Sequence, residues 1–188
     1  KNFLLVTATS FVFSTVLWVL WHFIDSHVLY LTGNGGFFYL PHAARVLCVI
    51  YFGFKAIPGL YLGELVGPYV LDPGLYSFST LLPSLISVMS VPFALTMLNS
   101  LGLTLGYTRS SPLNKRNYKH IFLITFISAG FNALIVNLYM SRNNLSFSNT
   151  ITDIEQVYRF LIGDLLGTII VFIFLAMLLI PVLRQARS

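Results

Sequence analysis

The chain has 188 residues, of which 56% are hydrophobic and only 9% are charged. Soluble domains carry about 25% charged residues, and the mean hydropathy here is +0.81. These values exclude a soluble enzyme, a disordered region and a free nucleic-acid-binding domain. The apolar stretches are continuous and do not alternate, which also excludes a transmembrane β-barrel. The sequence therefore predicts an all-α, polytopic membrane protein that forms one transmembrane domain over residues 1–188 and has the lipid bilayer as its first partner.

Six apolar stretches approach the roughly 20 residues that a helix needs to cross the hydrocarbon core. In chain order they cover residues 3–24, 37–54, 56–71, 78–105, 121–140 and 160–183. The first is too long for the core of a signal peptide and no A-x-A site follows it, so we expect a retained helix. Because the chain begins at Lys1 and not at Met, we also expect residues to precede it.

Prolines mark the irregular places in this pattern. The short third stretch carries Pro58 near its start and Pro68 near its end, and the long fourth stretch holds Pro83 and Pro92, which predict a kink or a tilt. Only about one residue, Lys55, separates the second stretch from the third. The sequence therefore predicts a tight helical hairpin at this point.

The distribution of lysine and arginine orients the helices. With the N-terminus in the cytoplasm, eight cations fall on the cytoplasmic side: Lys1, Lys55, Arg109, Lys115, Arg116, Lys119, Arg184 and Arg187. Only Arg142 and Arg159 fall on the outer side, together with four of the acids. Cytoplasmic loops carry the excess of cations in membrane proteins. We therefore expect six transmembrane helices with both termini in the cytoplasm.

Three ionisable residues remain inside predicted spans: Arg45, Glu64 and Asp164. Each such charge costs roughly 2.5–3.5 kcal/mol on insertion scales, so it normally faces a partner or a cavity. If the chain reverses near residue 55, two positions lie level when their numbers sum to about 110. Arg45 then lies beside Glu64, and the hairpin predicts an ion pair between them.

Other polar residues lie at similar depth. His42 and Arg45 are three residues apart and share a helix face, while Asp164 and Asn137 lie in the outer parts of their helices and Asn132 lies near the middle of its helix. We predict that His42, Arg45, Glu64, Asp164 and Asn137 line a ligand-binding pocket that opens outward. The alternatives are that the charges only fix helix register or that they relay protons.

Small residues recur at the spacing that allows close helix packing. The third stretch contains Gly59, Gly63 and Gly67, and the sixth contains Gly163 and Gly167. In each stretch one acid stands next to a glycine of this pattern, and the two helices run in opposite directions in the predicted topology. This pattern is compatible with a 3+3 inverted repeat, an arrangement known in transporters.

Two segments carry a resemblance to a known family. Residues 38–45, Phe-Tyr-Leu-Pro-His-Ala-Ala-Arg, and residues 57–64, Ile-Pro-Gly-Leu-Tyr-Leu-Gly-Glu, resemble the first conserved region of MASE1, and residues 163–167 resemble its late Gly-Asp motif. MASE1 is the integral membrane sensory domain that precedes bacterial histidine kinases and diguanylate cyclases. The similar segments cover about a quarter of the chain.

The resemblance implies a signal-transducing sensor in the bacterial inner membrane, with a sensing role for Pro41, Arg45, Gly63, Glu64, Gly163 and Asp164. Two departures stand against it. MASE1 domains usually have about eight helices and precede a cytoplasmic output domain, whereas this chain has six predicted spans and stops at Ser188. It would then be a piece of a longer protein or a free-standing relative that signals through a partner.

We expect a membrane sensor or binding module that takes a small anionic or zwitterionic ligand and relays its state to a cytoplasmic or membrane partner. One alternative is the substrate-binding subunit of a vitamin-type transporter, which this size and helix number resemble. Another is a structural subunit of a larger membrane complex. The sequence itself names neither the ligand nor the partner.

We expect no enzymatic activity, because no nucleophile stands at a recognisable spacing from a base. We also expect no cofactor, no metal and no nucleic-acid partner. The histidines form no i,i+4 pair and no CxxCH motif, which are typical of metal and haem sites. The single cysteine, Cys48, excludes an internal disulfide and is expected to be a small buried residue.

Overall fold

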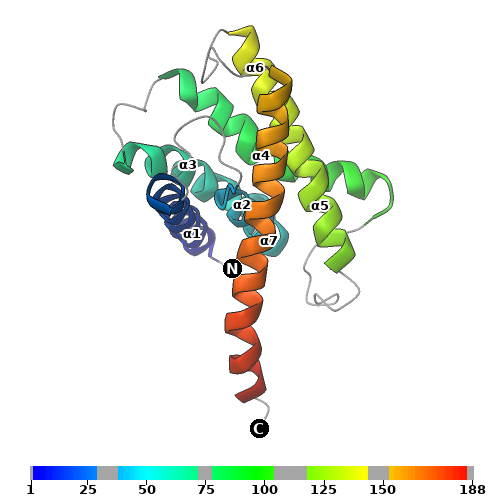
Figure 1. Cartoon of the computed structure of the whole chain (residues 1–188). Helices are drawn as coiled ribbons and strands as arrows, with labels where there is room; N and C mark the ends of the chain where they lie inside the picture. Colours follow the sequence, from blue (N-terminus) through cyan, green and yellow to red (C-terminus); the bar gives the residue numbers. More distant parts are fainter. Residues whose placement is uncertain (1, 29–37, 72–77, 104–117, 144–152, 186–188) are drawn as a thin grey trace.

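A computed structural model describes residues 2–28, 38–71, 78–103, 118–143 and 153–185, and the segments with regular secondary structure in these ranges are all helical (Figure 1). The α-helices are α1 (Phe3–Phe23), α2 (Pro41–Phe52), α3 (Ile57–Leu71), α4 (Leu81–Ser100), α5 (Tyr118–Phe131), α6 (Asn137–Arg142) and α7 (Asp153–Gln185). Short 3-10 or π segments join several of them.

Five helical segments are long and apolar enough to cross a membrane: Phe3–Ser26, Pro41–Leu71, Leu81–Ser100, Lys119–Arg142 and Ile154–Leu178. The predicted all-α, multi-pass class is thereby supported, but six separate spans are not found. The difference lies at Pro41–Leu71, where α2 and α3 form one helical stretch of 31 residues that is interrupted only by a 3-10 turn at Gly53–Ala56.

The chain folds back on itself at that turn. In a straight helix, two residues 19 positions apart lie about 28 Å apart, yet the side chains of Arg45 and Glu64 form an ion pair at 2.6 Å. Gly53 has a φ of 64°, in the left-handed region that favours glycine. The predicted reversal near residue 55 is confirmed, and it begins two residues earlier.

Helices α1 and α3 run parallel and pack against each other along most of their length. A Cβ added at Gly59 would collide with the backbone of Thr7, one at Gly63 would lie 2.7 Å from the Cβ of Ser14, and one at Gly67 would lie 2.6 Å from the Cγ of Trp18. The contacts advance in the same direction along both helices. The glycine spacing of α3 thus predicts the close approach correctly.

The glycines of α7 have a different neighbour. A Cβ added at Gly167 would collide with the backbone of Tyr39, and the Gly163 carbonyl accepts a hydrogen bond from the Tyr39 amide at 2.8 Å. Tyr39 lies in the non-helical segment before α2, so this packing is not the helix-on-helix contact that α3 makes with α1. The two glycine motifs therefore give the 3+3 inverted repeat no support.

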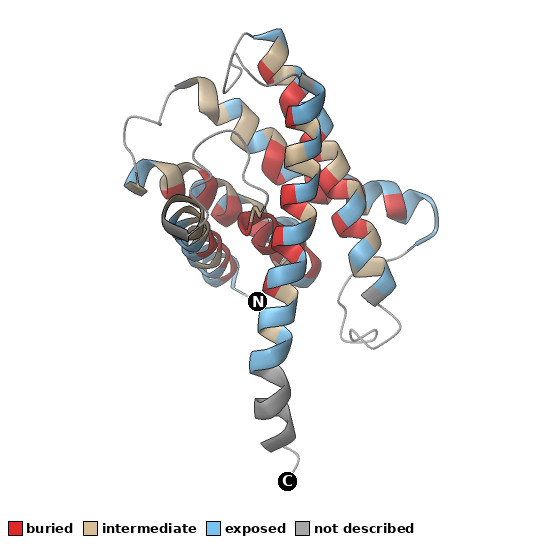
Figure 2. Cartoon of the chain, viewed as in Figure 1, coloured by how far each residue is buried: buried red, intermediate tan, exposed pale blue. Residues whose placement is uncertain are grey.

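Burial is concentrated where the helices cross. Figure 2 shows buried residues on the inward sides of the helices and exposed residues along the outer sides and along the part of α7 just above its grey end. Many of the exposed side chains are apolar, including Leu4, Val70, Leu138 and Met177, each more than 60% exposed. Lipid can cover such a surface at little cost, whereas water cannot, so the burial pattern agrees with a multi-pass membrane protein.

Several residues that support the predicted orientation lie outside the described ranges. They are Lys1, Asp72, Arg109, Lys115, Arg116 and Arg187.

Candidate functional site

The hairpin of α2 and α3 brings Arg45 and Glu64 together, and Tyr39, just before α2, joins them. The Nη2 of Arg45 donates to Oε1 of Glu64 at 2.6 Å, which confirms the predicted ion pair. The Tyr39 hydroxyl donates to the same oxygen at 2.5 Å and accepts from Nη2 of Arg45 at 3.1 Å. Arg45 is 1% exposed and Glu64 7%, so the pair is held away from solvent.

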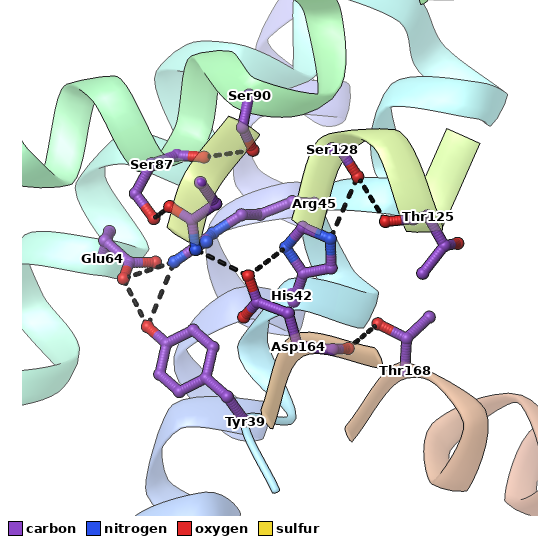
Figure 3. A network of polar contacts seen from close by, with 11 residues as sticks. Tyr39, His42, Arg45, Glu64, Ser87, Ser90, Thr125, Ser128, Asp164 and Thr168 are labelled. Atoms are coloured by element: carbon purple, nitrogen blue, oxygen red, sulfur yellow. Dashed lines mark hydrogen bonds and ion pairs between the residues drawn. The ribbon is translucent and has the colours of Figure 1, made fainter. Parts of the chain in front are cut away.

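A second cluster adjoins the first through α2, as Figure 3 shows. His42 lies one turn before Arg45, and its Nδ1 is 3.5 Å from Oδ2 of Asp164 on α7. Asn132 donates from Nδ2 to the same carboxylate oxygen at 2.6 Å. The other side of the imidazole meets Ser128, with Nε2 3.1 Å from the hydroxyl oxygen. Both His42 and Asp164 are at most 1% exposed.

Serine and threonine side chains complete this cluster. Ser87 of α4 donates to Oδ1 of Asn132 at 2.6 Å, and Ser128 donates to the Thr125 carbonyl at 3.1 Å. Thr168 donates back to the Asp164 carbonyl at 2.7 Å. Side chains from α2, α3, α4, α5 and α7, with Asn132 just after α5, therefore meet in one buried polar network.

Local backbone features place these side chains. Pro41 occupies the first position of α2, where its missing N–H costs little. Asn132 opens a π segment, Asn132–Val136, that interrupts the continuous helix formed by α5 and α6. Such segments are frequent at functional sites because the extra residue turns a side chain to a new direction. Here Asn132 reaches both α4 and α7.

Three aromatic rings cover the side of the network nearest α1. Trp18 and Trp21 have ring centroids 4.9 Å apart, and Tyr39 lies 5.2 Å from Trp21 and 6.3 Å from Trp18 in edge-to-face geometry. The guanidinium carbon of Arg45 is 5.2 Å from the centre of the Tyr39 ring, within the range of a cation–π contact. Tyr39 therefore joins the charged pair to the aromatic cluster.

Part of the hydrogen-bonding capacity of the network is unused. Among the described residues, Nε and Nη1 of Arg45 and Oε2 of Glu64 have no hydrogen-bond partner. Buried polar groups are nearly always hydrogen-bonded, and leaving one unpaired costs about 1–3 kcal/mol. Two donors and one acceptor thus remain for another molecule at the Arg45–Glu64 pair.

Four of the five predicted site residues meet here: His42, Arg45, Glu64 and Asp164. Asn137 does not join them, because it is buried on the next turn and donates to the Ala133 carbonyl of its own helix at 2.6 Å. The π segment Asn132–Val136 changes which side chains face the network. Asn132, and not Asn137, therefore donates to Asp164. Tyr39 is not among the predicted site residues, and nothing in the sequence singles out Ser87 or Ser128.

Two cavities lie elsewhere and are mainly apolar. One of about 370 Å³ lies between α4 and α5, where Met89 and Phe93 line it, and one of about 520 Å³ lies among α1, α2, α5 and α7, where Phe13, Tyr51 and Phe172 line it. Neither is lined by the charged residues of the network. Within the described ranges, no group of three or more His, Cys, Asp or Glu side chains is arranged to hold a metal.

No protein-family model matches the chain, and no curated protein and no solved structure matches it. The resemblance to MASE1 therefore rests on the quoted residues alone.

Proposed function

We propose that this protein is a membrane sensor or binding module whose ligand is recognised by Arg45 and Glu64. One observation carries the proposal: a fully buried guanidinium keeps two donors unpaired next to a carboxylate that keeps one oxygen unpaired. A network that served only to hold helices together would be expected to pair these groups, because each unpaired one destabilises the fold.

The free atoms define the class of ligand. Nε and Nη1 of Arg45 lie on different edges of the guanidinium, and each can donate a hydrogen bond to an oxygen of a carboxylate or phosphate. The free Oε2 of Glu64 accepts a hydrogen bond from an ammonium group. A small zwitterion would place its anionic group at a free donor of Arg45 and its ammonium group at Oε2 of Glu64, and a small anion would use Arg45 alone.

Binding at this site reaches α7 through Tyr39. The Tyr39 hydroxyl contacts both charged groups, while its backbone amide bonds the Gly163 carbonyl and its backbone packs on Gly167. A ligand that competes with the hydroxyl for Arg45 and Glu64 would move Tyr39 and alter its packing on α7. Such a ligand shifts the conformation only if it prefers one arrangement over the other.

α7 carries the change toward a partner. It has 33 residues, about 50 Å, and is longer than the roughly 30 Å hydrocarbon core. In the predicted orientation its C-terminal end enters the cytoplasm, where a signalling protein or another membrane subunit would read it. The MASE1-like segments support this sensory role and, with it, a bacterial inner membrane.

Thermal unfolding of the purified protein in detergent tests the proposal. A panel of small carboxylates, phosphates and amino acids is screened, and a true ligand present at about 100 times its Kd stabilises the folded state by ~2.7 kcal/mol. Arg45→Lys keeps the charge but removes the free N–H donors at Nε and Nη1, so it should lose this stabilisation. Arg159→Lys is the matched control, since Arg159 pairs with Glu155 on the surface.

If Arg45→Lys keeps the full stabilisation by every compound that protects the wild type, Arg45 does not bind the ligand. If no compound of either class protects the wild type and the protein co-purifies stably with other membrane subunits, a structural subunit is the better description.

We also propose that α2 and α3 cross the membrane separately, which gives six spans and cytoplasmic termini. The helices alone are about 18 Å and 22 Å long, so each is shorter than the hydrocarbon core. However, α3 lies parallel to α1 from the level of Thr7 to that of Trp18, so these contacts alone cover about 16 Å, or about half of the core. Lys55 would then lie near the cytoplasmic end of α1.

Cysteine labelling tests this topology in a Cys48→Ser background. Lys55 and Arg142 are both exposed. An impermeant maleimide should label Arg142→Cys in intact cells and Lys55→Cys only in inverted membrane vesicles. Labelling of Lys55→Cys from outside, or from neither side, would show instead that α2 and α3 form a re-entrant hairpin.

A further inference from the structure

The polar network contains a chain of hydrogen bonds whose directions can be followed from one end to the other. Ser90 donates to the Ser87 carbonyl, and the Ser87 hydroxyl donates separately to Oδ1 of Asn132 at 2.6 Å. That contact fixes the orientation of the Asn132 amide. Its Nδ2 therefore donates to Oδ2 of Asp164, also at 2.6 Å.

The opposite end of this chain of hydrogen bonds is the Thr125 carbonyl. The Ser128 hydroxyl donates its proton to the Thr125 carbonyl at 3.1 Å, so its oxygen is left to accept. The partner in that bond is Nε2 of His42 at 3.1 Å, which must then carry a hydrogen. A neutral histidine with hydrogen on Nε2 has a bare lone pair on Nδ1.

The two series of hydrogen bonds meet at His42 and Asp164. Neither Nδ1 of His42 nor Oδ2 of Asp164 carries a hydrogen in this arrangement. Nδ1 of His42 is 3.5 Å from Oδ2 of Asp164, and a lone pair facing an ionised carboxylate oxygen is repulsive. One proton between them removes the repulsion, whether it is covalently attached to Oδ2 or to Nδ1. Every other contact in the chain already has its own hydrogen.

Charge balance leads to the same result. Within the described residues, the ionisable groups facing this pair are Arg45 of α2, Glu64 of α3 and Tyr39, while α4 and α5 present only the uncharged Ser87, Thr125 and Ser128. The guanidinium balances one carboxylate of the two. The charged side chains of the network are at most 8% exposed, so a net charge there is costly. With Arg45 positive and both Glu64 and Asp164 negative, the network becomes neutral only if one more proton binds.

We infer that His42 and Asp164 form a proton-binding site that takes up and releases a single proton. Adding this proton makes the network neutral and joins α2 to α7 by a hydrogen bond between His42 and Asp164. Removing it leaves the lone pair on Nδ1 of His42 next to the negatively charged Oδ2 of Asp164, and the two repel each other. Proton occupancy would thus change the attachment of α7. The inference needs no ligand at Arg45 and stands or falls separately from it.

Infrared difference spectroscopy of the purified protein tests this directly. Spectra are compared between about pH 5 and pH 9, a range that brackets the ordinary titration of histidine near 6.5. A protonated carboxyl absorbs at a different frequency from a carboxylate, and histidine labelled with ¹⁵N reports the imidazole by NMR. The wild type should show one titrating group, either the carboxyl of Asp164 or the imidazole of His42.

Asp164→Asn should abolish that signal, because the amide is neutral and supplies its own hydrogen to Nδ1. Glu155→Gln is the matched control on the same helix and should leave the signal unchanged, since Glu155 is exposed and paired with Arg159. If the wild-type spectra contain no carboxyl or imidazole signal that Asp164→Asn removes, the inference is wrong.

His42→Gln provides a second variant in case Asp164→Asn does not accumulate. Removing the imidazole should move the pH midpoint of the Asp164 carboxyl signal by at least about one unit, or tenfold in proton affinity. An unchanged midpoint would overturn the proposal, because the two groups would then titrate independently.

Discussion

Arg45 and Glu64 lie 19 residues apart in the chain, yet a single 2.6 Å contact joins them inside the protein. Removing one partner leaves an unpaired buried charge, so Arg45→Met should destabilise the fold by about 3–5 kcal/mol. The double variant Arg45→Met with Glu64→Leu should recover most of that loss, because it removes both charges together. Equilibrium unfolding in mixed detergent micelles measures both values.

The surface pair Arg159 and Glu155 provides the comparison, since its side chains are 28% and 50% exposed. Removing either of these partners should change the free energy of unfolding by less than about 1 kcal/mol. A similar loss at both pairs would mean that burial does not determine the strength of the Arg45 pair.

Gly167 should be intolerant of even a methyl group. A Cβ at this position would collide with the backbone of Tyr39, which cannot move without breaking its bond to Gly163. We expect Gly167→Ala to destabilise the protein by about 1–3 kcal/mol. Gly130 of α5 is the matched control, because no atom lies within 4 Å of an added Cβ and alanine favours the helix by up to ~1 kcal/mol. Thermal unfolding of both variants should change in opposite directions.

The glycines of α3 should differ among themselves. At Gly59 an added Cβ meets the backbone of Thr7 and Phe11, whereas at Gly67 it meets only the side chain of Trp18. A side chain can rotate away and a helix backbone cannot, so Gly59→Ala should destabilise the α1–α3 contact more than Gly67→Ala. Trp fluorescence should change mainly in the Gly67 variant. Equal stability of the two variants would contradict the parallel packing described above.

Asn132 holds α4 and α7 together by two hydrogen bonds, one of them to a carboxylate. Asn132→Ala should therefore destabilise the fold by about 1–3 kcal/mol, because Ser87 and Asp164 both lose a buried partner. Asn143 makes a comparable bond to the Tyr139 carbonyl on the exposed end of α6. Asn143→Ala should have little effect on unfolding, and an equal effect would argue against a special role for Asn132.

Cys48 should react with maleimides according to their polarity. The thiol is 4% exposed and lines the apolar cavity of about 520 Å³ among α1, α2, α5 and α7. A hydrophobic maleimide should therefore label it at least about tenfold faster than a charged one. A cysteine at the exposed Lys55 in a Cys48→Ala background should react with both reagents. Equal rates at Cys48 would show that water reaches this cavity.

Hydropathy and charge predicted the all-α class, the reversal near residue 55 and the Arg45–Glu64 contact, but they predicted six apolar helices where the described residues form five long apolar segments. These features follow from local rules: an apolar stretch must be helical in lipid, and two adjacent helices joined by a short turn bring level residues together. The glycine spacing of α3 likewise indicated a close helix contact before its partner, α1, was known.

The site itself could be predicted only in part. His42, Arg45, Glu64 and Asp164 were recognisable because a charge or an imidazole inside an apolar span is costly and therefore unusual. Ser87 and Ser128 carry no such cost, so nothing distinguishes them from other serines in membrane helices. Asn137 was chosen by depth alone, and a single π segment at Asn132–Val136 altered which asparagine faces the carboxylate.

The amino-acid sequence determined which segments are apolar enough to cross a membrane and which charges need partners, since both depend on the free energy of transferring each group from water. Only the tertiary structure decided which residues pair with these charges. Tyr39 supports α7 at Gly167, and Asn132 joins α4 to α7, because the contacts between distant segments depend on helix direction and rotation. Shifting a helix by one residue along the chain rotates its side chains to new neighbours. The composition and hydropathy of the segment stay almost the same, so they do not reveal the rotation.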